Sequence, residues 1–179
     1  ALGDLIEWQI ADGTHGIVPC GTTGESATLS HAEHERVVAC TVEVTKRRVP
    51  VIAGAGSNST EEAIALTRHA KAAGADGALL ITPYYNKPTQ EGLFRHYKAI
   101  ADEVDIPLVL YNIPGRTGVN LAPSTVARLV NCRTIVAIKE SSDDPRRITD
   151  LHNLYGDRFI LFCGVDDLLL ESCALGIEG

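Results

Sequence analysis

The sequence contains no methionine and no long apolar run. Stretches such as GALLIT and IPLVLY fall far below the roughly 20 apolar residues that cross a bilayer. The opening stretch, ALGDLIEWQIADG, carries no basic segment of the kind that begins a secretion signal. We therefore expect no membrane contact and a cytoplasmic location. Because the chain starts at Ala1 and ends on ALGIEG without a closing signal, we also expect it to be part of a longer protein.

An excess of basic residues is lacking as well. Lys and Arg number 16 against 23 Asp and Glu, which gives a formal net charge of -7. Since surfaces that bind nucleic acid show a basic stripe, we expect no nucleic-acid partner. This charge does not exclude a small anionic ligand.

Cysteine spacings typical of metal or redox motifs are also absent. The five cysteines are odd in number and no two stand as C-x-x-C, which is typical of reduced thiols rather than of a disulfide framework or a zinc site. His31 and His34 have a spacing that metals use, but the sequence identifies no third ligand. We therefore expect no metal.

Short apolar runs rich in Val, Ile and Leu are present, and turn residues flank them. They are near-continuous rather than alternating, which is typical of parallel strands that are covered on both faces. We expect six such strands, within GIVPC (16–20), VPVIAG (49–54), GALLITP (77–83), IPLVLYN (106–112), IVAIKE (135–140) and FILFCG (159–164).

Helices are expected between these runs, one precedes the first run, and another follows the last. Ser30 with Glu33, and Ser59 with Glu62, fit the capping box that begins a helix. The resulting β-α repeat of about 30 residues fits either a doubly wound sheet or a (β/α)8 TIM barrel.

The barrel is the better prediction. Gly54-Ala-Gly56 begins like a dinucleotide-binding motif but lacks its third glycine. Polar residues follow many strands rather than one switch point, and a barrel keeps its active site at those strand ends. We expect residues 1–179 to form a single, incomplete (β/α)8 barrel domain, which a strand before Ala1 and a strand and helix after Gly179 would complete.

A lysine closes the run IVAIKE. Lys139 is either the first solvated residue after a strand or an amine held among apolar neighbours, where the charged form is disfavoured and the amine becomes a nucleophile. Attack on a ketone would give an imine, with protons moved by a group such as the Tyr111 hydroxyl. The Gly-Thr-Thr-Gly turn at residues 21–24 and Arg116 could bind carboxylates, although an ordinary turn and a surface charge are the simpler alternatives.

Four motifs occur in order over essentially the whole chain: GTTGES, TPYYNKP, YNIPGRTG and IKE. With them the chain resembles the pyruvate-dependent class I aldolase family, and within it the dihydrodipicolinate synthase branch. The resemblance implies a homotetramer that condenses pyruvate with aspartate semialdehyde in lysine and diaminopimelate synthesis. No cofactor is implied beyond the covalent imine of pyruvate with Lys139.

The resemblance also implies roles for individual residues. Tyr111, Thr22 and Tyr85 would relay protons, with Tyr85 contributed to a neighbouring subunit's site. Thr23 would bind substrate carboxylate, Arg116 would bind the carboxylate of the semialdehyde, and Gly164 would lie beside pyruvate. An inhibitory L-lysine site would include Ser26, Ala27, His31, His34, Asn58, Glu62 and Tyr84.

Two other functions stay open. One is a different pyruvate aldolase of the family, such as a sialic-acid or keto-sugar-acid lyase. Those lyases generally lack the arginine of PGRTG and the second threonine of GTTGE, both of which this sequence has. The other is a non-catalytic barrel fragment that binds lysine.

Overall fold

Five of the six apolar runs form the strands of one parallel sheet in the part of the chain that the structure describes. The structure is a computed structural model that describes residues 1–142, 144–177 and 179. The strands pair in chain order, and they are β1 (Ile52–Gly54), β2 (Gly77–Ile81), β3 (Leu108–Asn112), β4 (Ile135–Glu140) and β5 (Ile160–Cys163). A doubly wound sheet reverses its order at a switch point, whereas this order runs in one direction, as in a (β/α)8 barrel.

The prediction of a sixth strand at residues 16–20 is wrong. This run makes only an isolated parallel bridge, from Ile17 to Val51. Ile17 N donates to Pro50 O and Ile52 N donates to Ile17 O, both at 2.9 Å. Gly54 N also donates to Pro19 O at 2.9 Å, but Pro19 has no N–H to return a bond, and Cys20, with φ of 55°, turns the chain away, so no regular strand forms.

Helices follow the strands as predicted. Their bounds are α1 (Leu2–Ala11), α2 (His31–Thr45), α3 (Thr60–Ala73), α4 (Gln90–Glu103), α5 (Pro114–Thr117), α6 (Pro123–Leu129), α7 (Pro145–Tyr155) and α8 (Leu169–Ala174), with 3-10 turns η1 (Ser26–Thr28) and η2 (Asp166–Leu168). Within the described ranges, no helix has the combined length and apolar character needed to cross a bilayer.

The two predicted capping boxes differ. At α2, Ser30 and Glu33 bond reciprocally, which confirms the box. At α3, the Ser59 hydroxyl accepts from Glu62 N, but the Glu62 carboxylate is bonded to His31 and Ser57 instead of to Ser59 N. Only half of the second box is therefore formed, and the Glu62 side chain is turned toward other groups.

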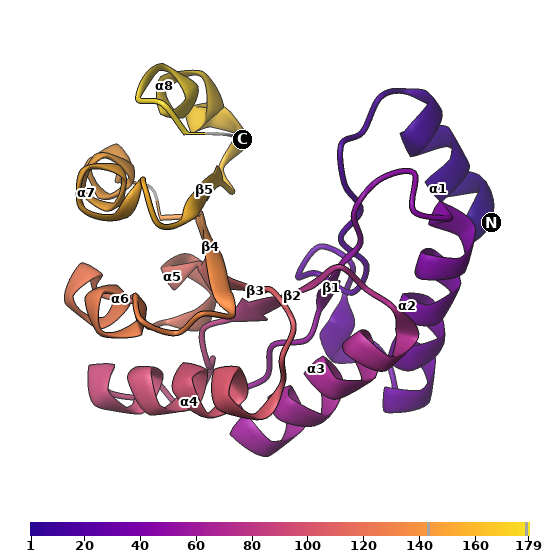
Figure 1. The fold of residues 1–179 in the computed structure, drawn as a ribbon, viewed down its shortest axis with the longest axis horizontal. Helices are drawn as coiled ribbons and strands as arrows, with labels where there is room; N and C mark the ends of the chain where they lie inside the picture. The colour runs from indigo at the N-terminus through magenta and orange to yellow at the C-terminus, as the bar shows by residue number, and fades with distance from the viewer. Residues whose placement is uncertain (143, 178) are drawn as a thin grey trace.

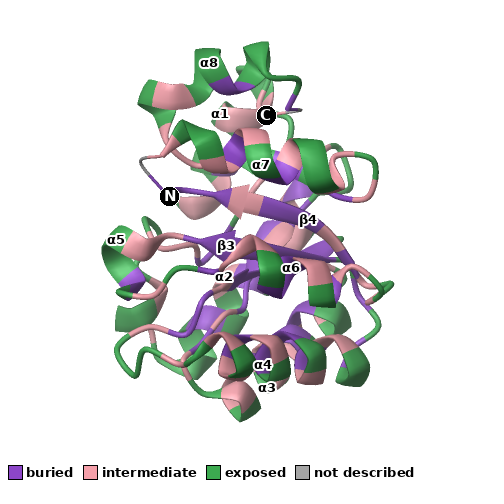
Figure 2. Ribbon diagram, turned by 90° about the vertical axis from the view of Figure 1, so that its left-hand side faces the viewer, coloured by how far each residue is buried: buried purple, intermediate pink, exposed green. Residues whose placement is uncertain are grey.

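The strands form an inner wall and the helices an outer layer, and the ribbon makes an arc that is open between α8 and α1 (Figure 1). A large apolar core lies between the sheet and the outer helices, where Leu80, Leu108 and Ile138 meet Leu93 and Tyr97. Strands β3 and β4 are mostly buried, whereas the outer helix faces are exposed (Figure 2).

The inner face of the sheet carries a separate apolar cluster that includes Leu79, Val109, Tyr111 and Ala137. Since side chains alternate along a strand, Tyr111 lies on the inner face and Asn112 on the helix-facing side. The same alternation separates Lys139 from Glu140. The ends of β3 and β4 thus each present one polar residue to the inside of the arc and the next one to the outer layer.

Candidate active site

Lys139 and Tyr111 lie side by side at the ends of two neighbouring strands. They are register partners in β4 and β3, and Lys139 Nζ stands 4.6 Å from the centre of the Tyr111 ring. Tyr111 is buried and Lys139 is half-buried. Lys139 forms no ion pair or hydrogen bond with a described residue. A partly enclosed amine without a carboxylate partner is what a lysine nucleophile requires.

Gly164 leaves room for this lysine. A Cβ at position 164 would lie 2.7 Å from Lys139 Cε and would overlap the Ser141 hydroxyl. The Gly164 N–H donates to Glu140 O at 2.8 Å, so the segment after β5 is held against the end of β4. Any side chain at 164 would therefore push the lysine out of its place.

A cavity of about 420 Å³ adjoins Tyr111. Four of the predicted catalytic and substrate-binding residues line it: Thr22, Tyr85, Tyr111 and Arg116. Lys139, Thr23 and Gly164 are not among the described residues that line it. The structure therefore brings four predicted residues to one hollow, with Lys139 next to its Tyr111 wall and Thr23 exposed outside.

Arg116 reaches the cavity from α5, a single turn that begins with Pro114 and stops at Gly118, whose φ of 70° favours glycine. The Thr117 hydroxyl lies 3.0 Å from Ile113 O and 2.9 Å from Val119 O, which fixes the turn. Arg116 itself is exposed and makes no ion pair with a described residue. Its guanidinium is free to take a carboxylate bidentately.

Thr22 is placed by a tight turn in which Glu25 N donates to Thr22 O at 3.1 Å and Glu25 adopts a φ of 54°. The turn passes directly over the end of β1. A Cβ at Gly54 would overlap the Cys20 carbonyl oxygen and lie 2.6 Å from its carbon, so this crossing needs glycine. Burial raises the pKa of the Cys20 thiol to about 11, which keeps it protonated and inert.

Tyr85 differs from the other residues of the predicted proton relay in its exposure and its backbone conformation. It is 90% exposed and its backbone has a φ of 69°, a left-handed conformation that is costly for an aromatic residue. Its hydroxyl therefore does not point into a finished site within this chain, although the residue borders the cavity.

The residues of the predicted lysine site fall into separate groups. His31 Nε2 and Glu62 Oε1 are 2.7 Å apart beside a hollow of about 300 Å³. A hydrogen bond from Ser57, and a weaker effect of the one from His31, hold the pKa of Glu62 below its usual value. Asn58 Nδ2 donates to Tyr84 O at 3.3 Å.

The other members of this set lie elsewhere. Ser26, Ala27 and Tyr84 line the larger cavity next to Thr22. His34 is buried, with Nε2 2.8 Å from Gly54 O, and burial lowers its pKa. Its ring is thus used inside the fold and does not join the pair formed by His31 and Glu62.

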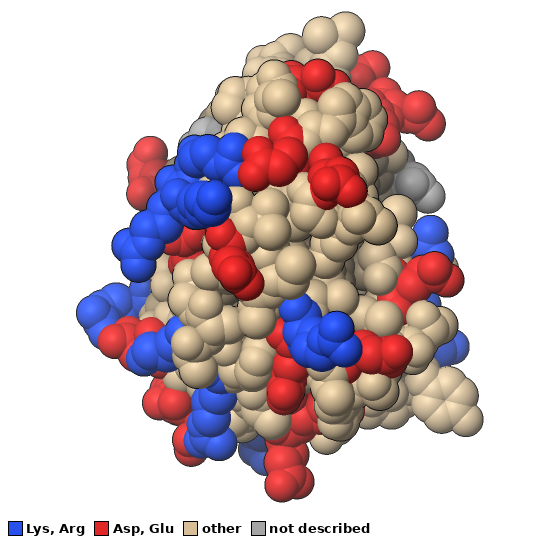
Figure 3. Space-filling model, turned by 90° about the vertical axis from the view of Figure 1, so that its right-hand side faces the viewer, with Lys and Arg blue, Asp and Glu red and all other residues tan. Residues whose placement is uncertain are grey.

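The metal-ligating side chains of the described residues form no evident metal site. Within residues 1–142, 144–177 and 179 there is no group of three His, Cys, Asp or Glu side chains that could hold a metal ion. On the face shown in Figure 3, basic side chains lie next to acidic ones. Among the ion pairs, Arg48 in the segment after α2 contacts Glu7 of α1 at 2.7 Å.

Sequence reasoning missed the polar residues behind the site. Asn112 and Glu140 follow Tyr111 and Lys139 and are buried; Asn112 donates to Glu140, and Glu140 also accepts from Arg147. A signal was present, because a charged residue on the helix-facing side of a covered strand requires a buried partner. The motifs YN and IKE each pair an inner polar residue with an outer one.

Residues 1–179 match the family model described as Dihydrodipicolinate synthetase family. A Syntrophobacter fumaroxidans protein named 4-hydroxy-tetrahydrodipicolinate synthase is 64% identical over 176 residues, which are 98% of this chain and 60% of that protein. A Geotalea uraniireducens protein of the same name is 59% identical over 178 residues, 99% of this chain and 61% of that protein. The chain spans about three fifths of the length of these curated relatives.

Solved structures agree with the fold. Dihydrodipicolinate synthase from Aquifex aeolicus gives a TM-score of 0.97 at 49% identity, and the chloride-inhibited Acinetobacter baumannii enzyme complexed with pyruvate gives 0.97 at 50%. Each match covers 99% of this chain and 61% of the other. These neighbours are TIM barrels, which confirms the predicted fold class.

Two further structures differ in bound molecule or assembly. The Cyanidioschyzon merolae enzyme has lysine bound (TM-score 0.95, 40% identity, covering 99% of this chain and 61% of that one). Another is described as the first monomeric dihydrodipicolinate synthase variant (TM-score 0.94, 41% identity, covering 99% and 60%).

Proposed function

This chain belongs to the dihydrodipicolinate synthetase family, and from that premise we propose that the protein containing it is a Schiff-base-forming lyase. It condenses pyruvate with L-aspartate 4-semialdehyde to 4-hydroxy-tetrahydrodipicolinate, on the path to diaminopimelate and lysine. The observation that carries the proposal is the Lys139 amine, which pairs with no described residue and stands 4.6 Å above the ring of Tyr111 at the adjoining strand end. Residues 1–179 would form one partial barrel domain of this cytoplasmic enzyme.

The first chemical step joins Lys139 to pyruvate. The lone pair of Nζ attacks the ketone carbon, and the carbonyl oxygen takes a proton through Tyr111 and becomes a hydroxyl. A second proton lets this hydroxyl leave as water while the nitrogen loses its own proton, which gives the imine. Thr22 and Tyr85, which border the same cavity, would pass these protons onward.

The second step forms the carbon–carbon bond. The protonated imine withdraws electrons, so the pyruvate methyl group loses a proton and becomes an enamine. The enamine carbon attacks the aldehyde carbon of the semialdehyde, whose oxygen takes a proton. The substrate's amino group then replaces Lys139 on the imine carbon, which closes the ring and frees the enzyme. All of this chemistry uses side chains of the protein and no cofactor.

Carboxylate recognition distinguishes this reaction from that of the sialic-acid and keto-sugar-acid lyases. Arg116 is an exposed guanidinium with no acidic partner among the described residues, and it faces the cavity that Tyr111 lines. This supports an aldehyde that carries its own carboxylate. Thr23, one residue beyond Thr22, would bind the pyruvate carboxylate, with Gly164 leaving space beside it.

An L-lysine effector is the natural second ligand. The paired His31 and Glu62 border a hollow of about 300 Å³, and Glu62 offers a carboxylate to an ammonium group. Lysine is bound in the Cyanidioschyzon merolae structure. Ser26, Ala27, Asn58 and Tyr84 would complete this site, and His34 would support it from inside. A barrel that only binds lysine would keep this site and form no pyruvate adduct.

Assembly into a homotetramer is the remaining part of the proposal. The 90% exposure of Tyr85 supports an arrangement in which its hydroxyl enters a neighbouring subunit's site. A monomeric variant exists among the solved relatives, so the assembly is to be measured for this protein.

Borohydride trapping tests the imine. We expect the full-length enzyme, incubated with pyruvate and reduced, to carry a stable adduct on the peptide that contains Lys139. Lys139→Ala should abolish the adduct, and Lys71→Ala, at an exposed lysine on α3, should leave it unchanged. Mass spectrometry of the digested protein locates the adduct. A folded enzyme with no adduct would exclude Schiff-base chemistry and leave the lysine-binding barrel as the better account.

A further inference from the structure

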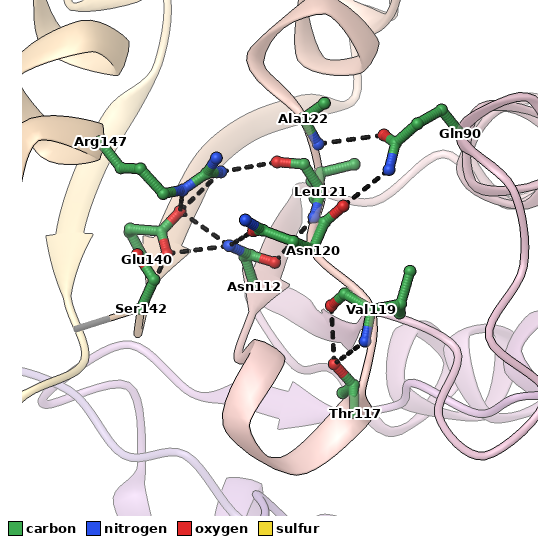
Figure 4. A network of polar contacts seen from close by, with 10 residues as sticks. All are labelled: Gln90, Asn112, Thr117, Val119, Asn120, Leu121, Ala122, Glu140, Ser142 and Arg147. Carbon is green, nitrogen blue, oxygen red and sulfur yellow. Dashed lines mark hydrogen bonds and ion pairs between the residues drawn. The ribbon is translucent and has the colours of Figure 1, made fainter. Parts of the chain in front are cut away.

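A buried polar network joins Asn112, Glu140 and Arg147 (Figure 4). Asn112 and Glu140, the next residues along β3 and β4, are register partners like the pair before them. Their side chains face the outer layer, and they are 0% and 3% exposed. An ionised group at this depth needs a full set of partners.

Glu140 has such a set. Asn112 Nδ2 donates to its two carboxylate oxygens at 2.9 and 3.0 Å, and Ser142 N donates to Oε1 at 2.8 Å. Arg147, near the start of α7, donates from Nε and Nη2 to Oε2 at 3.2 and 3.1 Å. The Arg147 side chain is only 12% exposed, so this is a buried pair of opposite charges.

The network also holds the segment that follows α5. Arg147 Nη2 donates to Leu121 O at 2.6 Å, and Leu121 N donates to Asn112 Oδ1 at 2.9 Å. On the far side, Gln90 of α4 donates to Asn120 O at 2.7 Å and accepts from Ala122 N at 3.0 Å. One set of contacts thus ties the strand ends of Tyr111 and Lys139 to the segment after Arg116.

Stability alone does not explain this arrangement. Well-packed apolar side chains often replace a buried ion pair with no loss of stability. The position of the Glu140–Arg147 pair, directly after Lys139 in the chain, suggests a role in the chemistry of that lysine rather than in stability. A lone buried carboxylate there would favour the unreactive ammonium form of the lysine, and a lone guanidinium would favour the free amine. Together the two charges cancel.

We propose that Glu140, Asn112 and Arg147 are positioning residues that hold Lys139 over Tyr111 and keep the local charge balanced during imine formation. The inference rests on the proposed function, because it takes Lys139 as the imine-forming residue. A displacement of about 1 Å at such a site can slow a reaction about 100-fold, so a rigid support behind the strand ends has a direct chemical effect.

The pH dependence of pyruvate trapping depends on the ionisable groups that surround Lys139. Tyr111 stands beside it on β3, and Glu140 follows it on β4 with Arg147 of α7 behind. β5 contributes Phe162, the register partner of Lys139, and then Cys163, the partner of Glu140. Arg116 lies farther along, at the adjoining cavity.

The test measures the rate of pyruvate trapping in the full-length enzyme. We expect Glu140→Gln and Arg147→Lys to slow imine formation about 10- to 100-fold while the half-saturating pyruvate concentration changes less than about threefold. Arg147→Lys keeps the charge and loses only the forked contacts. Matched controls are Glu103→Gln and Arg68→Gln, which break an exposed ion pair between α3 and α4 and should leave the rate unchanged.

A second readout is the pH of half-maximal trapping rate. We expect it to fall in Glu140→Gln, to rise in Arg147→Gln, and to return toward the original value in the double variant. A role in stability alone would not produce shifts of opposite sign that cancel.

The outcomes separate the two proposals. If the unaltered enzyme traps no pyruvate, the proposed function and this inference both fail. If it traps pyruvate normally and folded Arg147→Lys and Glu140→Gln proteins do so at the same rate and pH, only the positioning role is overturned. Should Glu140→Gln fail to fold, Arg147→Lys decides the question by itself.

Discussion

At the scale of single residues, the chain shows how burial sets protonation. His96 on α4 is 5% exposed, and its Nδ1 lies 2.9 Å from the Thr60 hydroxyl. Its Nε2 has no hydrogen-bond partner among the described residues. Burial disfavours the charged ring and lowers the pKa of His96 to about 4.

This histidine predicts acid sensitivity. Between about pH 6.5 and 4 the unfolded chain binds a proton at His96 that the folded chain does not. The free energy of unfolding is therefore unaffected by His96 above pH 6.5. As the pH falls toward 4, protonation of this residue in the unfolded chain lowers that free energy by up to about 3 kcal/mol. We expect His96→Asn to flatten the fall in unfolding free energy across this range, measured by urea denaturation of the full-length enzyme.

An exposed histidine provides the control. His15→Asn should leave the pH dependence as it was. Equal slopes in the His96→Asn and unaltered proteins would contradict the assignment of the acid sensitivity to this ring. Burial also lowers the pKa of His34, so part of the slope should persist in His96→Asn.

At the scale of elements, the sequence predicted most of the fold, because each βα unit carries its own signals. Near-continuous apolar runs marked five strands, and serine caps marked the starts of α2 and α3. The failure at residues 16–20 has a local cause: Pro19 accepts from Gly54 N but has no N–H of its own to donate, and the left-handed Cys20 then turns the chain away. Apolar content alone did not reveal this backbone interruption.

The candidate site was predictable only in part. Position at the end of an apolar run identified Lys139 and Tyr111, since polar side chains at covered strand ends are conspicuous. It did not identify the partners of Glu140, because Arg147 lies on another element and its contact depends on how α7 packs. The left-handed backbone of Tyr85 is likewise a property of the folded loop.

The crossing of the 20–24 turn over β1 gives a prediction about an element junction. Gly54→Ala would place a methyl group against the Cys20 carbonyl, where only backbone could yield. We expect a loss of at least about 2 kcal/mol in unfolding free energy, together with displacement of Thr22 and lower activity. Gly115→Ala is the matched control, since nothing lies within 4 Å of its added carbon. Similar melting temperatures for the two variants would contradict the close crossing.

At the scale of the whole molecule, the exposed Tyr85 predicts complementation between subunits. A subunit carrying Tyr85→Ala keeps Lys139, and one carrying Lys139→Ala keeps Tyr85. If Tyr85 serves a neighbour's site, refolding two inactive full-length variants together should restore about a quarter of the activity, the share of complete sites under random pairing. Steady-state assay of the mixture measures this.

The control mixture combines Lys139→Ala with Tyr111→Ala. These side chains meet within one chain, so no pairing of subunits rebuilds both in one site. Activity in this control, or none in the first mixture, would count against a shared site.

The order of the sheet has a consequence for synthesis. Each strand pairs with the strand that precedes it in the chain, from β1 through β5, with one helix-containing connection between them. On the ribosome, every new βα unit therefore meets a partner that has already emerged, and no strand waits for a distant one. The sheet can therefore grow by one βα unit at a time during translation. We expect a nascent chain to gain protease resistance in steps of one βα unit.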